Sequence, residues 1–126
     1  MKLRHLFLVN IFFAAFFGLS CTLFPAFVFR LYGLVPDEAG LWVTRLVGGS
    51  ILGFGTLMWF GLRNASNDAR RAIAMALLIQ DGVGFIASLI FQLSGQVNWF
   101  GWPSLGLYAA LACAYAVFLF VVPAAS

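Results

Sequence analysis

Long apolar runs alternate with short polar segments along this chain. Four runs contain almost no charged side chains, and they cover residues 6–31, 41–62, 72–93 and 104–122. An α-helix needs about 20 residues to cross the roughly 30 Å of hydrocarbon in a bilayer. The pattern therefore predicts an all-α fold, an integral membrane four-helix bundle, in which residues 1–126 form a single transmembrane domain.

The polar segments between the runs carry signals for helix starts. Pro36 is followed by two acidic residues, an order that suits a first helical turn, because proline is tolerated there and acids complement the partial positive charge of a helix start. Ser66 or Asn67 is suited to cap the third helix. Pro103 is suited to open the fourth helix. These signals support three short connections between four helices.

Composition identifies the solvent around these helices. Of the 126 residues, 63% are hydrophobic and only 9% are charged, and the mean hydropathy is +1.02. Soluble domains carry about a quarter of their residues as charged side chains. The four runs leave little chain for a soluble domain, and the loops are too short for a catalytic head. We therefore expect a membrane protein that lies in a lipid bilayer.

The distribution of basic residues predicts how the helices are oriented. Cytoplasmic loops of membrane proteins are enriched in lysine and arginine. Most of the basic residues lie at the amino terminus or around the second loop: Lys2, Arg4, Arg63, Arg70 and Arg71. With four crossings these residues lie on one side, so both termini are expected in the cytoplasm. Topology then accounts for the net charge of +3, and no nucleic-acid partner is expected.

Two arginines and two tryptophans lie near the opposite ends of the predicted helices. Arg30 and Arg45 are expected to extend their charged groups to the outer membrane interface. Trp99 and Trp102 lie in the third loop, where their rings fit the aromatic belt that membrane proteins place at the level of the lipid headgroups. These four residues are the predicted interfacial anchors.

Each predicted helix has one face of small or polar side chains at spacings of three and four residues. Membrane helices gain no hydrophobic energy by associating, so they depend on close contacts at small residues and on interhelical hydrogen bonds. The glycines expected to make such contacts are Gly18, Gly49, Gly53 and Gly84. Gly49 and Gly53 match the GxxxG pattern of packed membrane helices, a pattern that does not identify the partner helix.

Asp81 is a carboxyl group inside the third apolar run. It lies ten residues beyond Arg71, which corresponds to a depth of about 15 Å, near the middle of the membrane. Measured in the same way from the basic side, Asn10, Thr56 and Tyr115 lie about 9 to 12 Å deep. These four side chains are predicted to form an intramembrane polar layer. Arg45 lies about 12 Å from the level of Asp81 and is not expected to pair with it.

Two interpretations of Asp81 remain open at this point. Desolvation at mid-membrane depth disfavours the charged form, so a carboxyl without an arginine is expected to be neutral. A neutral Asp81 would hydrogen-bond Asn10, Thr56 or Tyr115 and help to hold the bundle together. Alternatively, Asp81 is a proton-binding or substrate-binding site, because ionisable residues inside membranes often mark relays and pathways.

Other kinds of chemistry find little support. The one histidine, His5, cannot supply a zinc site or a pair of haem ligands from a single chain. Cys21 and Cys113 differ in height by about 10 Å, which is too far for a disulfide. No cofactor, metal site or catalytic residue is therefore predicted. Eight phenylalanines surround the first helix, which favours contact with lipid or a partner helix over a quinone or pigment pocket.

The segment RLVGGSILGFGTLMWFGLR, residues 45–63, is followed by a short polar loop, an alanine-rich third helix and a tryptophan-rich turn into the fourth. In this layout the chain resembles the small four-helix bacterial membrane proteins that are grouped as DoxX-like or as uncharacterised families. The resemblance implies a multi-pass bundle in a bacterial inner membrane, sometimes beside a redox complex. It supplies no catalytic residues.

These observations lead to two functional hypotheses. In the first, the protein is a structural or accessory subunit that packs against partner membrane helices, because its polar groups suffice for packing. In the second, it is a small oligomeric, proton-coupled transporter or a carrier of lipophilic ligands that uses Asp81. The expected partner is accordingly another membrane protein or a second copy of the chain. A membrane enzyme is the least supported class.

The orientation is tested with reporter fusions. A reporter that is active only after export should be inactive when fused at residue 126, and it should be active when inserted near Asp37. The physical reason is the concentration of basic residues on the side of the termini. The opposite pattern of activity would invert the topology.

Overall fold

The computed structural model describes residues 3–63 and 66–121, and the regular secondary structure in these residues is entirely helical. The helices are α1 (Leu3–Leu23), α2 (Pro25–Leu31), α3 (Glu38–Arg63), α4 (Asn67–Leu93) and α5 (Gly101–Phe120). All but α2 are long and apolar enough to cross a membrane. The predicted all-α bundle is confirmed, and the protein is a multi-pass membrane protein.

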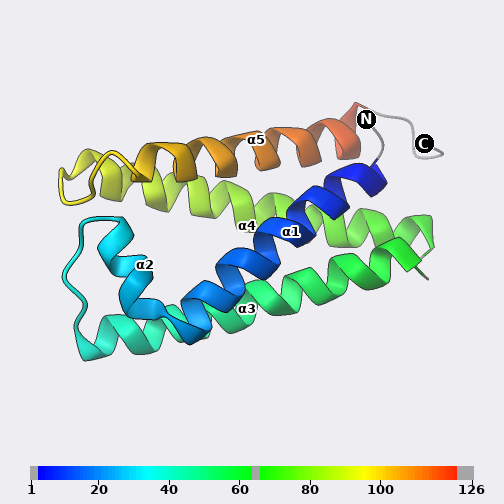
Figure 1. Ribbon diagram of the computed structural model, residues 1–126. Helices are drawn as coiled ribbons and strands as arrows, with labels where there is room; N and C mark the ends of the chain where they lie inside the picture. Colours follow the sequence, from blue (N-terminus) through cyan, green and yellow to red (C-terminus); the bar gives the residue numbers. More distant parts are fainter. Residues whose placement is uncertain (1–2, 64–65, 122–126) are drawn as a thin grey trace.

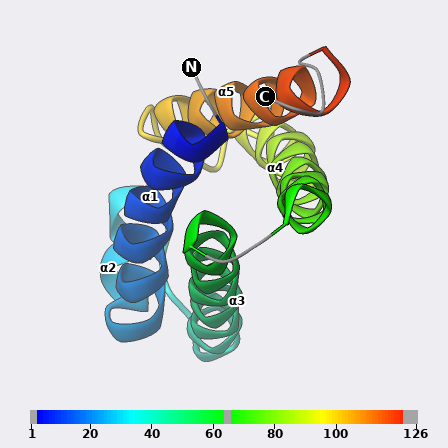
Figure 2. The same ribbon diagram turned by 90° about the vertical axis from the view of Figure 1, so that its right-hand side faces the viewer.

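The long helices associate as two pairs, α1 with α3 and α4 with α5, and contacts between the pairs are far fewer. Figure 1 shows α5 running along α4 and α1 crossing α3 at an angle. Viewed along its length in Figure 2, the bundle has the four long helices arranged in a ring, with α1 opposite α4 and α3 opposite α5. The start of α1, the end of α3, the start of α4 and the end of α5 lie at the same end of the bundle (Figure 1).

The first apolar run is not one helix, so the predicted span 6–31 is wrong. The chain leaves helical geometry at Phe24, which has φ −131° and ψ 55°, and Pro25 begins the short helix α2. Proline has no amide hydrogen to continue the helical ladder of α1, but its fixed φ suits a first helical turn. As a result α2 turns away from the axis of α1 and contacts both α1 and α3 (Figure 1).

The other long helices, α3, α4 and α5, start near the predicted signals and begin earlier than the apolar runs do. Helix α3 begins at Glu38 and not at residue 41, and the carboxylate of Asp37 accepts a hydrogen bond from the Gly40 amide at 2.7 Å. Helix α4 begins at Asn67 and not at residue 72, with the Ser66 hydroxyl accepting from the Ala69 amide at 3.2 Å. Helix α5 begins at Gly101 and not at 104. Capping side chains thus extend α3 and α4 into the polar segments, whereas the start of α5 has no side-chain cap.

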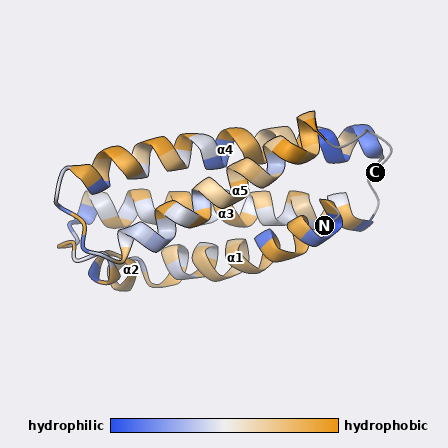
Figure 3. Cartoon of the chain, turned by 90° about the horizontal axis from the view of Figure 1, so that it is seen from above, coloured by the Kyte–Doolittle hydropathy of each residue, from blue (hydrophilic) through white to orange (hydrophobic). Residues whose placement is uncertain are grey.

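Apolar side chains cover most of the outside of the bundle. Figure 3 shows the long helices largely in hydrophobic colours, with hydrophilic segments towards their ends and one near the middle of α4, where Gln80 and Asp81 follow each other. Large side chains such as Phe12, Ile79 and Ile90 are 60–68% exposed. Such a surface suits hydrocarbon, which solvates apolar side chains and no polar ones.

Close backbone contact between α1 and α3 occurs at Gly18 and Gly48. A Cβ atom added to Gly48 would lie 2.8 Å from the carbonyl oxygen of Gly18, and it would also collide with Thr22 of α1. Gly18 was a predicted packing glycine and Gly48 was not. Gly84, also predicted, packs against the ring of Tyr108. Small residues thus make the close contacts within both helix pairs.

Gly49 and Gly53, the GxxxG pair, do not pack against any helix of the described chain. Both are exposed, and a Cβ added to either would meet no atom within 4 Å. A helix turns about 100° per residue, so the shift from Gly48 to Gly49 moves a position from the contact with α1 to the outside of the bundle. The predicted packing at Gly49 and Gly53 is therefore wrong for this chain. The GxxxG spacing identifies two glycines on one helix face, but it does not specify whether that face meets a neighbouring helix.

One end of the bundle contains Arg4, Arg63, Arg70 and Arg71, and we call it the basic end. Two of these arginines hydrogen-bond to carbonyl groups at helix ends. Arg70 Nε donates to the carbonyl of Gly61 in the last turn of α3 at 2.6 Å. Arg71 Nη2 donates to the carbonyl of Leu119 in α5, also at 2.6 Å. Carbonyls in the last turn of a helix lack helical partners, and cations there also complement the helix dipole.

Three features used in the sequence analysis lie outside the described residues, namely Lys2, the carboxyl-terminal residue and the predicted end of the fourth helix at residue 122. Both cysteines are free thiols, with Cys21 buried and Cys113 exposed.

Alanine substitutions at the two adjacent glycines test the packing of α3. Gly48→Ala and Gly49→Ala gain the same helix propensity, about 1 kcal/mol, so their difference reports the packing. We expect Gly48→Ala to be less stable than Gly49→Ala by about 1–3 kcal/mol, because its methyl group meets α1. Unfolding of both variants in mixed micelles measures the difference, and equal stability would place the two glycines in equivalent surroundings.

Candidate ligand-binding cavity

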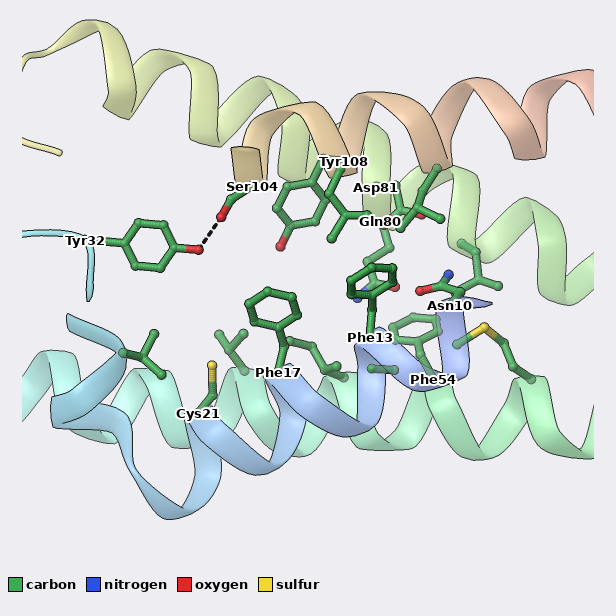
Figure 4. Close-up of a pocket in the computed structure, with 18 residues that line it drawn as sticks. Asn10, Phe13, Phe17, Cys21, Tyr32, Phe54, Gln80, Asp81, Ser104 and Tyr108 are labelled. Carbon is green, nitrogen blue, oxygen red and sulfur yellow. Dashed lines mark hydrogen bonds between the residues drawn. The ribbon is translucent and has the colours of Figure 1, made fainter. Parts of the chain in front are cut away.

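A cavity of about 200 Å³ lies between the two helix pairs and is lined by side chains from all five helices (Figure 4). For scale, an apolar cavity of about 150 Å³ holds a benzene molecule. The closely packed core lies largely beyond the cavity towards the basic end, where Leu6, Phe7, Ala74 and Leu119 are buried. The cavity occupies the middle of the bundle and the half towards α2.

The cavity is bounded towards the basic end by a buried hydrogen bond between the pairs. Asn10 Nδ2 of α1 donates to the hydroxyl of Tyr115 in α5 at 2.7 Å. The Tyr115 hydroxyl in turn donates to Met58 Sδ of α3 at 3.7 Å. Tyr115 is completely buried, so these contacts satisfy its hydroxyl away from water. They also connect three helices at one point.

At the opposite end the cavity is bounded by α2 and the segment that follows it. The hydroxyls of Tyr32 and Ser104 lie 2.5 Å apart and form a hydrogen bond (Figure 4). Burial raises the pKa of the Tyr32 hydroxyl above its ordinary value. Asn98 ties the α4–α5 loop to the same end of the cavity. Its side-chain Nδ2 donates to the Leu31 carbonyl at 2.9 Å, and its backbone N–H donates to the Tyr32 carbonyl at 3.1 Å.

Asp81 lies on the wall of the cavity and is only 4% exposed. Its Oδ2 atom has no hydrogen-bond partner among the described residues. A buried polar atom without a partner costs free energy, and in folded proteins such atoms are rare. In Figure 4, Asp81 lies between Tyr108 and Asn10, beside the space that the lining side chains surround. Asp81 is therefore a buried carboxyl group with an unpartnered oxygen at the wall of the cavity.

Two further polar side chains face the cavity without a hydrogen bond to the described chain. Gln80, beside Asp81, and Tyr108, on α5, both line the cavity, and neither side chain forms a hydrogen bond with another described residue. Figure 4 shows the Tyr108 hydroxyl pointing into the space between the helices. Together with Asp81 they form a polar wall that can donate and accept hydrogen bonds.

The opposite wall is apolar and largely aromatic. Phe13 and Phe17 of α1, with Val47, Ile51 and Phe54 of α3, line this side. Their neighbours Phe12 and Phe16 point outwards and are 68% and 58% exposed. The phenylalanines of α1 thus divide between the outer surface and the cavity, so contact with lipid or a partner helix does not account for all of them.

The structure assembles part of the predicted polar layer. Asn10 and Tyr115 are hydrogen-bonded, and Asp81 lines the same cavity as Asn10. The expected hydrogen bonds of Asp81 with Asn10, Thr56 or Tyr115 do not form among the described residues. Thr56 is exposed, and its hydroxyl donates to the carbonyl of Leu52 on its own helix at 2.9 Å. Depth was estimated along each helix, but rotation about the axis places Thr56 on the outward face.

The predicted interfacial residues are all exposed. Arg30 lies in the last turn of α2, and Arg45 lies on the outward side of α3. Trp99 is 73% exposed and Trp102 is 51% exposed. None of these four residues lines the cavity. They remain predicted interfacial anchors.

Tyr32, Asn98 and Gln80 were not among the residues predicted for the site. The signal for Tyr32 was Pro25, because a break there turns the chain back towards the bundle. The signal for Gln80 was its position next to Asp81 inside an apolar run. Asn98 carried no signal, because it binds backbone carbonyls of a loop that is distant in sequence.

The arrangement is suited to binding. Among the described residues, no three histidine, cysteine, aspartate or glutamate side chains lie close enough to hold a metal ion. Comparison of the chain with protein-family models, with curated proteins and with solved structures finds no match. The cavity and its residues are therefore the basis for a functional proposal.

Removing the hydroxyl of Tyr115 or that of Tyr108 tests the hydrogen-bond partners described above. Tyr115→Phe should lose about 0.6 kcal/mol, an average intramembrane hydrogen bond, because Asn10 loses its acceptor. Tyr108→Phe should not reduce stability, because its hydroxyl has no partner in the described chain. Unfolding in mixed micelles compares the two variants, and an equal loss would contradict the assignment.

Proposed function

We propose that this protein binds a small lipophilic molecule inside the membrane, in the cavity between its two helix pairs. The observation that supports the proposal most directly is Asp81, a buried carboxyl with an unpartnered oxygen on the wall of a cavity of about 200 Å³. A ligand with a hydrogen-bond donor would satisfy that oxygen. Binding would then recover the free energy that the unpartnered oxygen costs the empty protein.

The mixture of apolar and polar side chains in the cavity lining supports the same function. Ligand sites are mostly apolar, with a few polar groups that orient the ligand. Here Phe13, Phe17 and Ile51 provide apolar surface, while Gln80, Asp81 and Tyr108 provide polar groups on the facing wall. A purely structural role for Asp81 would require it to hydrogen-bond its neighbours, and no such bond is present among the described residues.

The proposal includes the location and orientation of the protein. We place the basic end on the cytoplasmic side of a bacterial inner membrane, because Arg4, Arg63, Arg70 and Arg71 gather there. Both termini are then cytoplasmic. The cavity lies about midway through the bilayer, and its α2 end faces the opposite side. Proton-coupled transport by an oligomer remains the further hypothesis for the use that the cell makes of such a site.

One observation favours a second candidate, an accessory subunit or homo-oligomer that packs through α3. Gly49 and Gly53 expose a glycine face with open space beside it. Small residues on a membrane helix allow another helix to approach closely. Leucine at both positions would fit in the isolated chain but would block a partner. Loss of an associated subunit with unchanged stability of the chain would support this candidate.

A cavity-filling variant tests the proposed function. Ile51→Trp places a large ring in the cavity, whereas Leu57→Trp makes a similar change on an exposed part of the same helix. The probes are 4-phenylbutanol and 4-phenylbutylamine, which combine one ring with a short polar chain. At 100 times its Kd, a probe stabilises the folded protein by about 2.7 kcal/mol.

We expect at least one probe to raise the Tm of the parent and of Leu57→Trp in detergent, and not that of Ile51→Trp. Ile51→Trp removes the space that the probe would occupy. If neither probe stabilises the parent, or if Ile51→Trp responds as strongly as Leu57→Trp, the cavity is not the binding site.

A further inference from the structure

The charges around the cavity select among possible ligands. Asp81 is the one carboxylate in the lining, and the lining contains no lysine, arginine or histidine. The arginines nearest to it in sequence, Arg70 and Arg71, are bonded to helix-end carbonyls at the basic end. Arg30 and Arg45 are exposed. Among the described residues no basic side chain lines the cavity to compensate a negative charge there, so an anionic ligand would be repelled when Asp81 is ionised.

The unpartnered oxygen of Asp81 requires a donor, and the low dielectric of the membrane interior strengthens any opposite charge beside it. An ammonium group supplies both the charge and up to three donors. A hydroxyl supplies one donor and no charge. Hydrogen bonds between charged groups are about twice as strong as neutral ones. A cation therefore satisfies this carboxyl better than a neutral ligand does.

Aromatic rings provide the second element of a cation site. Phe13, Phe17 and Phe54 lie across the cavity from Asp81, and Tyr108 lies beside it (Figure 4). The faces of such rings attract cations, and the attraction is stronger when the cation is removed from water. Gln80 also lines the cavity and offers a carbonyl oxygen as a further acceptor for an ammonium group.

From these features we infer that the ligand is a lipophilic amine, bound as its ammonium form with the charged nitrogen at Asp81. Its apolar body lies between Phe17, Ile51 and the α2 end of the cavity. The volume exceeds that of a cavity that holds benzene, which suits one ring with a short chain. This inference rests on the proposed function and specifies its ligand class.

Three probes of matched size test the inference, namely 4-phenylbutylamine, 4-phenylbutanol and 4-phenylbutyrate. They share a ring and a four-carbon chain and differ in carrying a cation, a neutral donor or an anion. The Kd of each is measured from its effect on Tm, at one pH near neutrality, for the parent and for Asp81→Asn. This substitution keeps the size of the side chain and breaks no hydrogen bond that the described chain makes with Oδ2.

The amine should bind the parent about tenfold more tightly than the alcohol, and the carboxylate should bind most weakly. In Asp81→Asn the preference for the amine should disappear, with the Kd of the alcohol unchanged within about threefold. Comparing the amine-to-alcohol ratio between the two proteins cancels the different partitioning of the probes into micelles. Asp68→Asn, which removes an exposed carboxylate at the start of α4, is the control and should keep the parent ratio.

Phe17→Leu provides a second variant that leaves Asp81 in place. Removing one ring should weaken the amine more than the alcohol, by about two- to fivefold, since only the cation is attracted to the face of the ring. If the amine and the alcohol bind the parent equally, or if Asp81→Asn keeps the preference, the inference fails while the proposed function stands. If no probe stabilises the parent, the proposed function fails instead.

Discussion

Helices in a bilayer associate without a hydrophobic driving force, and the structure of this protein depends on that constraint. Close contact is made at glycines: the backbones of Gly18 and Gly48 meet in one helix pair, and the ring of Tyr108 packs against Gly84 in the other. Between the pairs, individual hydrogen bonds such as that of Asn10 with Tyr115 provide specific contacts. Two well-packed pairs joined at a few points leave room for a cavity, which a uniformly packed core would not.

The same constraint explains why Asp81 is informative. In water an unpartnered carboxyl is solvated, but in hydrocarbon a polar group must find its partner inside the protein or in a bound molecule. The neighbouring polar groups have other arrangements: Asn10 bonds Tyr115, and Thr56 bonds its own helix. The unused hydrogen-bonding capacity of Asp81 is therefore concentrated on the cavity, and this concentration connects the packing of the bundle to its proposed function.

The sequence predicted the number of membrane-spanning helices and the class of fold, because length and hydropathy are properties of each segment alone. It also predicted Gly18, Gly84, Asn10 and Tyr115 as interior residues. It failed at Gly49, Gly53 and Thr56, since spacing along a helix identifies a face but not the direction in which that face points. The cavity could not be predicted, because it arises from the distance between helix pairs. The break before α2 was also missed: Pro25 is the residue that causes it, but the apolar run continues through this position, so hydropathy alone predicted one helix.

The lengths of the helices have a consequence for the membrane itself. Each pair joins a shorter helix, α1 with 21 residues or α5 with 20, to a longer one, α3 with 26 or α4 with 27. At 1.5 Å per residue the shorter helices measure about 30 Å and the longer ones about 40 Å. A helix longer than the hydrocarbon layer is accommodated by tilting or by local thickening of the bilayer. Bilayer thickness therefore acts on the tilt of α3 and α4, one from each pair, and through them on the separation of the pairs.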